Sequence, residues 1–127
     1  MERSVEVFAI ILIGVISVSH LVQPRAWVEY FILLRSKGEA GAFVDGFVHL
    51  PLAGFIIAFH NVWSGIPAVL TLLGWCFLIK SLVRFCLPSL ALRMMARVSI
   101  ERTREVQVAG AALMVLAGLL GYGVWAG

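Results

Sequence analysis

Four long apolar stretches dominate the chain, and short polar segments separate them. They cover about Val5–Gln23, Ala40–Phe59, Pro67–Leu87 and Val106–Trp125. Each has roughly the 20 residues that an α-helix needs to cross the hydrocarbon core of a bilayer. Glu2 and Glu6 beside Arg3 do not fit the basic start of a cleaved signal peptide, so we expect the first stretch to be retained as a span. The pattern predicts an all-α membrane protein with four transmembrane helices.

Two prolines begin amphipathic segments, one after the first span and one after the third. From Pro24 to Ser36, apolar side chains recur at the i, i+3, i+4 and i+7 positions of a helix, namely Trp27, Tyr30, Phe31 and Leu34. Proline suits the first position of a helix, where its missing N–H is not needed. Pro88 opens a similar stretch, with Arg93 and Arg97 on one face and Leu90, Met94 and Val98 on another. We expect both segments to lie in the membrane interface, the first ending at Gly38.

Composition and charge agree with a membrane protein. The chain has 127 residues, of which 61% are hydrophobic and 13% charged, against about 25% charged in a typical soluble domain. Its pI of about 9.3 does not indicate a nucleic-acid partner, because the basic residues lie beside apolar runs. Of the Lys and Arg residues, Arg3 alone lies away from the ends of the first and third spans and the segments that follow them. The positive-inside rule then places those segments in the cytoplasm and both termini on the non-cytoplasmic side, in the cytoplasmic (inner) membrane of a bacterium.

The two halves of the chain follow one scheme: a span, a proline-led amphipathic helix and a glycine-bearing span. A shift of 64 positions aligns Pro24 with Pro88 and Gly46 with Gly110. We therefore predict a single membrane domain, residues 1–127, built as two similar hairpins at about 5–60 and 66–126. Because each half crosses the membrane twice, the repeat is parallel rather than inverted.

Five polar residues inside the spans are the main candidates for chemistry, because buried polar groups are costly in a membrane. At 1.5 Å per residue, four of them lie about 6–13 Å inward from the basic side: His20, Asp45, His49 and Lys80. Asp45 and His49 share a helix face as an i, i+4 pair. Lys80 is the expected ion partner of Asp45, and Arg84 shares the face of Lys80.

Three interpretations of this cluster stay open. It is a buried polar group that fixes the register of the helices, with Lys80 and Arg84 reaching toward the interface. Alternatively, it is a proton-linked or ligand-binding site, in which histidine titrates near neutral pH. In the third interpretation, His20 and His49 ligate haem or a metal. We expect no metal and no cofactor, with haem or quinone as the alternatives.

Other residues have simpler expected roles. Trp27, Tyr30, Phe31, His60 and Trp63 are typical interfacial anchors. Small residues in the fourth span form a stripe that allows close helix packing, within the chain rather than in a dimer: Gly110, Ala117, Gly118 and Gly121. Cys76 and Cys86 are about 15 Å apart on one helix, too far to form a disulfide, and we expect both to be buried.

The sequence contains no Gly-rich phosphate loop, no HExxH and no nucleophile elbow. Its polar segments are too short for an enzymatic domain. We therefore expect a protein that is not an enzyme.

The stretch GVISVSHLVQP at Gly14–Pro24, followed by Trp27 and then by FVHLPLAG after Gly46, resembles the DoxX-like membrane proteins. That family has four spans, and its first span often ends in a G…H-(F/L)-x-x-P pattern, matched here by His20 and Pro24. The likeness covers about Gly14–Phe59, and the remainder agrees in span count. Where the family often has Glu, this chain has His49, so a role tied to that acid does not carry over. The resemblance implies a compact four-helix bundle. Some relatives are subunits of membrane oxidoreductase systems, including quinone-linked ones, and many have no known activity.

These observations lead to three functional hypotheses. The first is a non-catalytic accessory subunit of a larger membrane complex, with a redox complex as one such case. The second is a small oligomeric transporter or channel that uses Asp45, His49 and Lys80. The third is a module that binds haem, quinone or lipid between the first two spans. The expected partners are the lipid bilayer and either other membrane subunits or further copies of the chain.

Overall fold

The computed structural model describes residues 2–96 and 102–126, which form six α-helices. They are α1 (Glu2–Val22), α2 (Pro24–Ser36), α3 (Glu39–Phe59), α4 (Pro67–Cys86), α5 (Pro88–Met95) and α6 (Thr103–Ala126). Of these, α1, α3, α4 and α6 are long and apolar enough to cross a membrane. The prediction of an all-α, four-span protein is confirmed. Arg97 and Val98, which the sequence placed in the second amphipathic stretch, lie outside the described residues.

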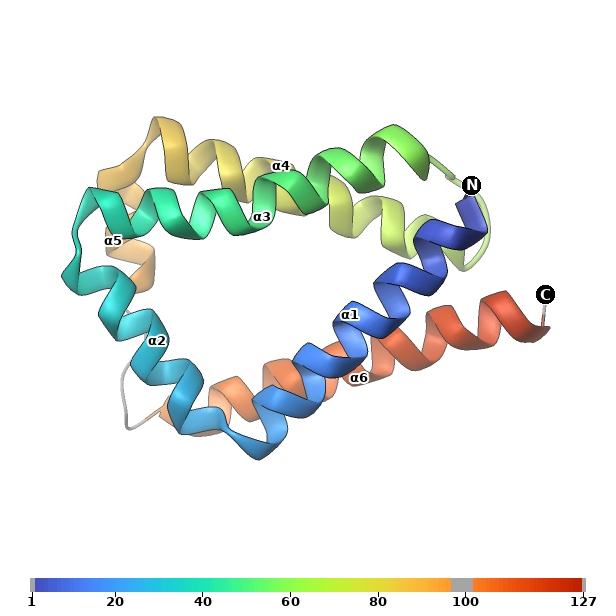
Figure 1. Ribbon diagram of the computed structural model, residues 1–127, viewed down its shortest axis with the longest axis horizontal. Coiled ribbons are helices and arrows are strands. Elements are labelled where there is room, and N and C mark those ends of the chain that lie inside the picture. The colour runs from blue at the N-terminus through green and yellow to red at the C-terminus, as the bar shows by residue number, and fades with distance from the viewer. Residues whose placement is uncertain (1, 97–101, 127) are drawn as a thin grey trace.

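The four long helices form two pairs. Helix α1 packs along α6, and α3 packs along α4, whereas the two pairs touch each other at few positions (Figure 1). Contacts between the pairs include Glu6 with His60 and Phe8 with Phe55, both close to the N-terminus. Toward α2 and α5 the pairs diverge, and both termini lie at the opposite end (Figure 1). The chain thus has an end with the termini and an end with the short helices.

These pairs do not join the spans of one predicted half. Helices α1 and α3, from the first half, contact each other little, and so do α4 and α6, from the second. In the predicted repeat, α1, α2 and α3 correspond to α4, α5 and α6. Under this correspondence the observed contact α1–α6 matches α4–α3, and α2–α6 matches α5–α3. The two halves therefore interlock, and the repeat itself stays a prediction.

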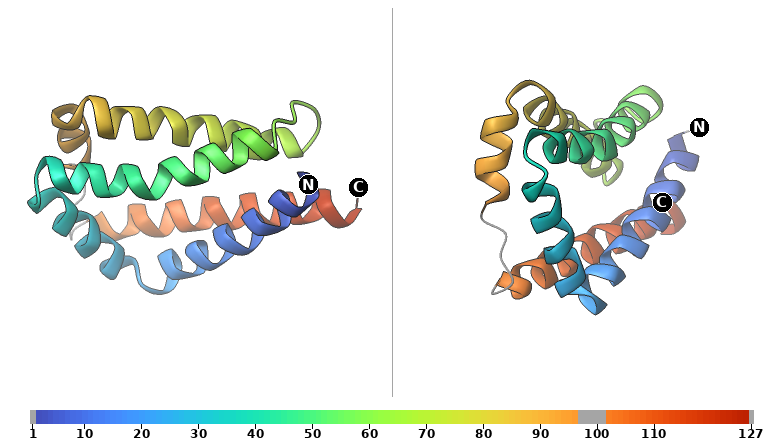
Figure 2. Two further views of the ribbon diagram at one scale, coloured as in Figure 1. Left: turned by 45° about the horizontal axis from the view of Figure 1, so that its top comes forward. Right: turned by 60° about the vertical axis from the view of Figure 1, so that its left-hand side comes forward.

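Helices α2 and α5 lie together at the end with the short helices (Figure 2), where α2 contacts both pairs and α5 contacts α2, α3 and α4. Each begins with its proline, Pro24 or Pro88. Just beyond α2, Gly38 adopts a φ of +64°, a conformation that side chains disfavour and glycine allows. The guanidinium of Arg35 donates to the carbonyl oxygens of Met95 and Ala96, at 3.4 and 3.1 Å. Arg35 therefore connects α2 to the C-terminal end of α5, where a cation is favourable.

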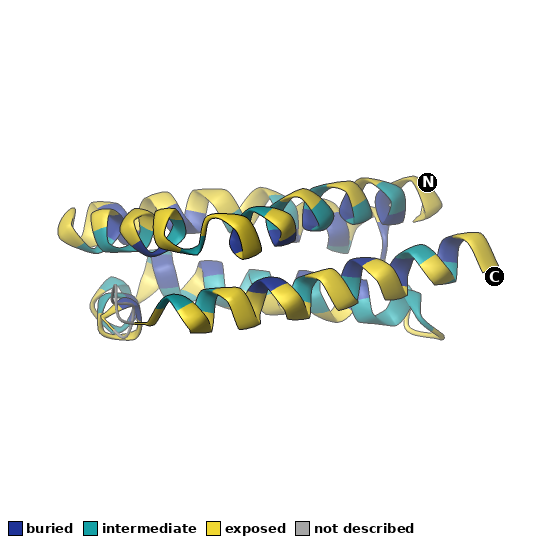
Figure 3. Cartoon of the chain, turned by 90° about the horizontal axis from the view of Figure 1, so that it is seen from below, coloured by how far each residue is buried: buried dark blue, intermediate teal, exposed yellow. Residues whose placement is uncertain are grey.

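The hydrophobic core is small and lies in the half with the termini. It consists of Val5, Ala9, Ile13, Ile56, Leu70, Ala117 and Leu120. Buried residues form narrow stripes on the helices, and exposed or partly exposed residues make up the remainder (Figure 3). In the most apolar window of each span, between 22% and 33% of the residues are buried. The chain therefore presents broad apolar faces to the membrane.

The predicted small-residue stripe divides into two parts. Gly110 is buried against α1, where an added Cβ would lie 2.6 Å from the Cβ of His20, and Ala117 belongs to the core. Gly118 has no neighbour within 4 Å of such a Cβ, and at Gly121 the nearest atoms belong to Trp125 of the same helix. Close packing between α1 and α6 thus depends on Gly110.

This difference predicts opposite effects of one substitution. We expect Gly110→Ala to lower the free energy of unfolding by about 1–3 kcal/mol, because the added methyl forces α1 and α6 apart. Gly118→Ala adds the same methyl in open space, and we expect it to raise stability by up to about 1 kcal/mol through helix propensity. Thermal unfolding in detergent measures both. Equal effects of the two substitutions would contradict the close approach at Gly110.

The expectation that both cysteines are buried is wrong. Cys76 and Cys86 are free thiols, as predicted, but both are exposed on the surface of the chain. In a membrane protein such a position is apolar too, because the surrounding lipid tails are as apolar as a protein core.

Candidate functional site

Four of the five candidate residues meet between α3 and α4. Asp45 and His49 come from α3, and Lys80 and Arg84 from α4; we call these four residues the α3–α4 charge cluster. The Nε–H of Arg84 donates to Oδ2 of Asp45 at 2.7 Å, and the two side chains are 8% and 4% exposed. Lys80 Nζ lies 3.9 Å from the same oxygen. The expected ion partner of Asp45 is thus present, but Arg84 makes the closer contact.

His49 connects the backbone of α3 to Lys80. Its Nδ1 lies 2.8 Å from the carbonyl oxygen of Asp45, which accepts hydrogen bonds and cannot donate them. Nδ1 therefore carries the proton, and Nε2 is left to accept from Lys80 Nζ at 3.2 Å. The ring also makes an edge contact with Phe77, with 5.1 Å between ring centroids. This geometry describes a neutral imidazole in one defined tautomer.

The cluster carries more positive than negative charge. Lys80 and Arg84 face the single carboxylate of Asp45, and the neutral His49 does not change the sum. Arg84 Nη1 is buried without a hydrogen-bond partner, the single such side-chain atom in the described part of the chain. A buried donor without an acceptor costs about 1–3 kcal/mol. The cluster therefore holds an unused donor and an unbalanced charge.

Local sequence explains why these side chains meet. Both pairs are spaced i, i+4, so each lies on one face of its helix. Between them, Gly46 allows close approach, because an added Cβ would lie 2.8 Å from the ring of Phe85 and 3.1 Å from the Cβ of Arg84. Asp45 also acts on helix α2, since burial and then the Asp45 carboxylate raise the pKa of Tyr30.

His20, the fifth candidate, belongs to the other helix pair. Its ring stacks on Trp27, with 4.1 Å between ring centroids, and its Nδ1 lies 2.8 Å from the carbonyl oxygen of Ile16. The structure therefore does not present His20 and His49 as paired axial ligands. Within residues 2–96 and 102–126, no group of three or more His, Cys, Asp and Glu side chains is arranged to hold a metal ion.

The predicted interfacial aromatics have different environments. Trp27, Tyr30 and Phe31 contact one another on α2, and Trp27 Nε1–H donates to Oγ of Ser19 at 2.8 Å. Trp63 is 58% exposed at the end with the termini, where its Nε1–H donates to Oδ1 of Asn61. These positions suit residues at the boundary between lipid and water.

The expectation that His60 is an interfacial anchor is wrong. His60 is fully buried, and its Nε2 lies 2.8 Å from Oε1 of Glu6 on α1. Its Nδ1 lies 3.3 Å from the hydroxyl of Thr71 on α4. The sequence shows Glu6 and Thr71 as polar residues inside spans. Their common partner, His60, lies 54 positions from Glu6 and 11 positions from Thr71. Depth along a helix does not reveal such a meeting.

Glu6, His60 and Thr71 together fasten α1 to the connection between α3 and α4. The Thr71 hydroxyl donates to the carbonyl oxygen of Val62 at 2.6 Å and accepts from the N–H of Val62 at 3.1 Å. An acid, a histidine and a hydroxyl in series also occur in hydrolases. Here both His60 and Thr71 are fully buried, and the hydroxyl is engaged by the backbone. We therefore interpret these three residues as a structural fastening.

The fold and the site define a class: a four-span helical membrane protein with a buried charge cluster in one of its two helix pairs. Comparisons of the chain with models of protein families, with curated proteins and with solved structures find no match.

Proposed function

We propose that the chain is a non-catalytic accessory subunit of a larger membrane assembly. The observation that carries this proposal is the loose association of the two helix pairs, together with the broad apolar faces that each span leaves exposed. Helix association in a membrane relies on close packing rather than on the hydrophobic effect. Further transmembrane helices, packed on these faces, would complete the packing that the chain lacks by itself.

The resemblance of Gly14–Phe59 to DoxX-like proteins makes a redox assembly, including a quinone-linked one, the first class to examine. The basic residues beside the first and third spans support a location in the cytoplasmic membrane of a bacterium, with both termini on the non-cytoplasmic side. Accessible-cysteine labelling of a Ser4→Cys variant, made without Cys76 and Cys86, tests this orientation in intact cells. We expect an impermeant reagent to label the introduced thiol. Protection of this thiol would mean that the termini lie on the cytoplasmic side.

Purification from native membranes in mild detergent, followed by mass spectrometry, tests the subunit proposal. We expect larger membrane proteins in a fixed ratio to this chain. Substituting exposed apolar residues with larger ones, as in Val115→Trp, is expected to release them, whereas the shorter change Val115→Ala is the matched control. A lone small oligomer in native membranes would contradict an accessory role.

The charge cluster favours a second candidate, a small proton-linked transporter. Asp45 is a buried carboxylate in contact with two cations, and His49 contacts one of them through Nε2. Ionisable groups inside spans mark proton and ion paths in many transporters. This candidate requires that the cluster change its proton content during each transport cycle.

We expect Asp45→Asn to reduce pH-driven flux in proteoliposomes to the level of empty vesicles, if the cluster transports protons. Glu29→Gln is the control, because Glu29 is an exposed acid paired with Arg25 on α2. A pH-indicating dye trapped in the vesicles reports the flux. Wild-type vesicles that behave as empty ones would remove this candidate and leave the accessory role.

A further inference from the structure

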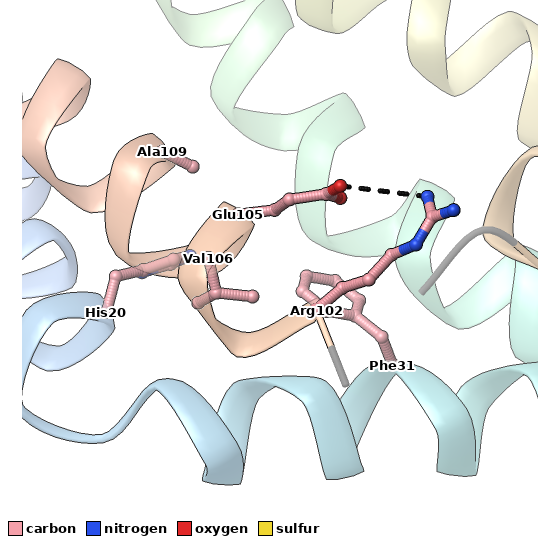
Figure 4. Close-up of a pocket in the computed structure, with 6 residues that line it drawn as sticks. All are labelled: His20, Phe31, Arg102, Glu105, Val106 and Ala109. Carbon is pink, nitrogen blue, oxygen red and sulfur yellow. Dashed lines mark ion pairs between the residues drawn. The ribbon is translucent and has the colours of Figure 1, made fainter. Parts of the chain in front are cut away.

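A cavity of about 210 Å³ lies between the end of α1, helix α2 and the start of α6. Its lining residues face one common space (Figure 4): His20, Phe31, Arg102, Glu105, Val106 and Ala109. None of them belongs to the α3–α4 charge cluster. The cavity is therefore a separate feature of the α1–α6 pair, at the end that carries the short helices.

His20 is held rigidly at the edge of this cavity. The face of its ring stacks on Trp27, and Gly110 of α6 lies so close that an added Cβ would be 2.6 Å from the Cβ of His20. Nδ1 is 2.8 Å from the carbonyl oxygen of Ile16, so Nδ1 carries the proton. His20 is 8% exposed, and its Nε2 makes no hydrogen bond or ion pair within the part of the chain that the structure describes. One hydrogen-bond acceptor without a protein partner is thus left at the cavity.

The other lining residues determine which kind of ligand can donate a hydrogen bond to Nε2 of His20. Phe31, Val106 and Ala109 offer apolar surface. Arg102 and Glu105 pair with each other, with 3.7 Å between Nη1 and Oε1, so their charges compensate. A charged head group would find no unpaired counter-charge among these six lining residues, whereas a neutral group that donates one hydrogen bond would match Nε2.

We propose that this cavity binds an uncharged amphiphile whose compact head carries a hydroxyl group, of the alkylphenol or long-chain alcohol type. The hydroxyl donates to Nε2 of His20, and the ring or chain beside it contacts Phe31 and Val106. The apolar tail extends into the lipid, from which the ligand enters. This inference does not depend on the accessory role, because it concerns one cavity within a single chain.

Photolabelling of the full chain in phosphatidylcholine nanodiscs tests the proposal. The probe is an alkylphenol with a diazirine next to the ring, and labelled peptides are identified by mass spectrometry. We expect label on α2 and on the start of α6. At equal mole fraction in the membrane, 4-nonylphenol should compete about tenfold better than nonylbenzene, the effect of about one buried hydrogen bond.

Two variants, with one control, test separately the hydrogen bond to His20 and the volume of the cavity. His20→Phe keeps an aromatic ring for Trp27 and removes the acceptor, so nonylphenol should lose its advantage over nonylbenzene. Ala109→Trp fills the cavity and should abolish labelling there, whereas Ala112→Trp adds the same ring on α6 at a position outside the lining. The Ala109 and Ala112 variants decide the matter if His20→Phe does not fold. Equal competition by the two compounds in the wild type, or unchanged labelling in Ala109→Trp, would overturn the proposal.

Discussion

Replacing Asp45 with leucine is expected to lower the free energy of unfolding by about 3–5 kcal/mol, the largest effect of any single substitution considered for this chain. The physical reason is the partner that it leaves behind. Arg84 is held by Asp45 at 2.7 Å and is 6% exposed, so its charge would stay buried with no carboxylate beside it. Titration with sodium dodecyl sulfate in mixed micelles, followed by circular dichroism, measures this change.

A double-mutant cycle tests whether the loss comes from the pair itself. Arg84→Leu alone is expected to cost less than Asp45→Leu, because Lys80 and His49 still face the carboxylate. With both residues changed to leucine, most of the lost stability should return, since a buried ion pair replaced by apolar groups is often neutral or stabilising. Arg25→Leu, in the exposed Arg25–Glu29 pair, should change stability by at most about 1 kcal/mol. Additive losses from Asp45→Leu and Arg84→Leu would contradict the coupling.

Replacing Glu6 with leucine is expected to loosen the end of the molecule that carries the termini. His60 would lose the hydrogen-bonded carboxylate at 2.8 Å, a contact worth about 1.5–3 kcal/mol when one partner is charged. We expect amide hydrogen exchange in residues 60–66 to become about 10–100 times faster, which is the same free energy expressed as an equilibrium constant. Hydrogen exchange with mass spectrometry in nanodiscs measures it.

Three further substitutions define the cause of this effect. Thr71→Val removes the bonds to the backbone of Val62 and should accelerate exchange in the same segment, while Thr71→Ser should preserve it. Asn61→Ala removes an exposed contact with Trp63 and should change little. Unaltered exchange in Glu6→Leu would mean that Glu6, His60 and Thr71 do not fasten α1 to the α3–α4 connection.

The sequence determined the elements of this protein closely. Hydrophobic runs placed the four spans within three residues of their observed ends, and Pro24 and Pro88 marked the first residues of α2 and α5. Spans are predictable because a backbone in lipid must satisfy its own hydrogen bonds, so a long apolar run has one stable conformation. The turn at Gly38 was predicted for a similarly local reason.

Contacts between helices were only partly accessible to the same reasoning. Asp45, His49 and Lys80 lay at similar depths, and opposite charges buried in lipid attract strongly, so Lys80 was the expected ion partner of Asp45. That Arg84 would make the closer contact did not follow from depth. His20 shared that depth, but it packs on Trp27 and Gly110 in the other helix pair. Depth is a coordinate along the helix and contains no information about rotation around it.

Tertiary structure alone decided which helices pair and which polar groups become buried. The pairing of α1 with α6 depends on the space at Gly110, and the burial of His60 depends on Glu6 arriving from 54 positions away. From the sequence alone, a histidine at the end of a span is predicted to be an interfacial anchor. In the folded chain, a carboxylate from another helix packs against it and the histidine is buried. The sequence determined where the chain enters and leaves the membrane because that depends on local hydrophobicity. The tertiary structure decided which helices pack together, because packing depends on how the surfaces of two helices fit each other.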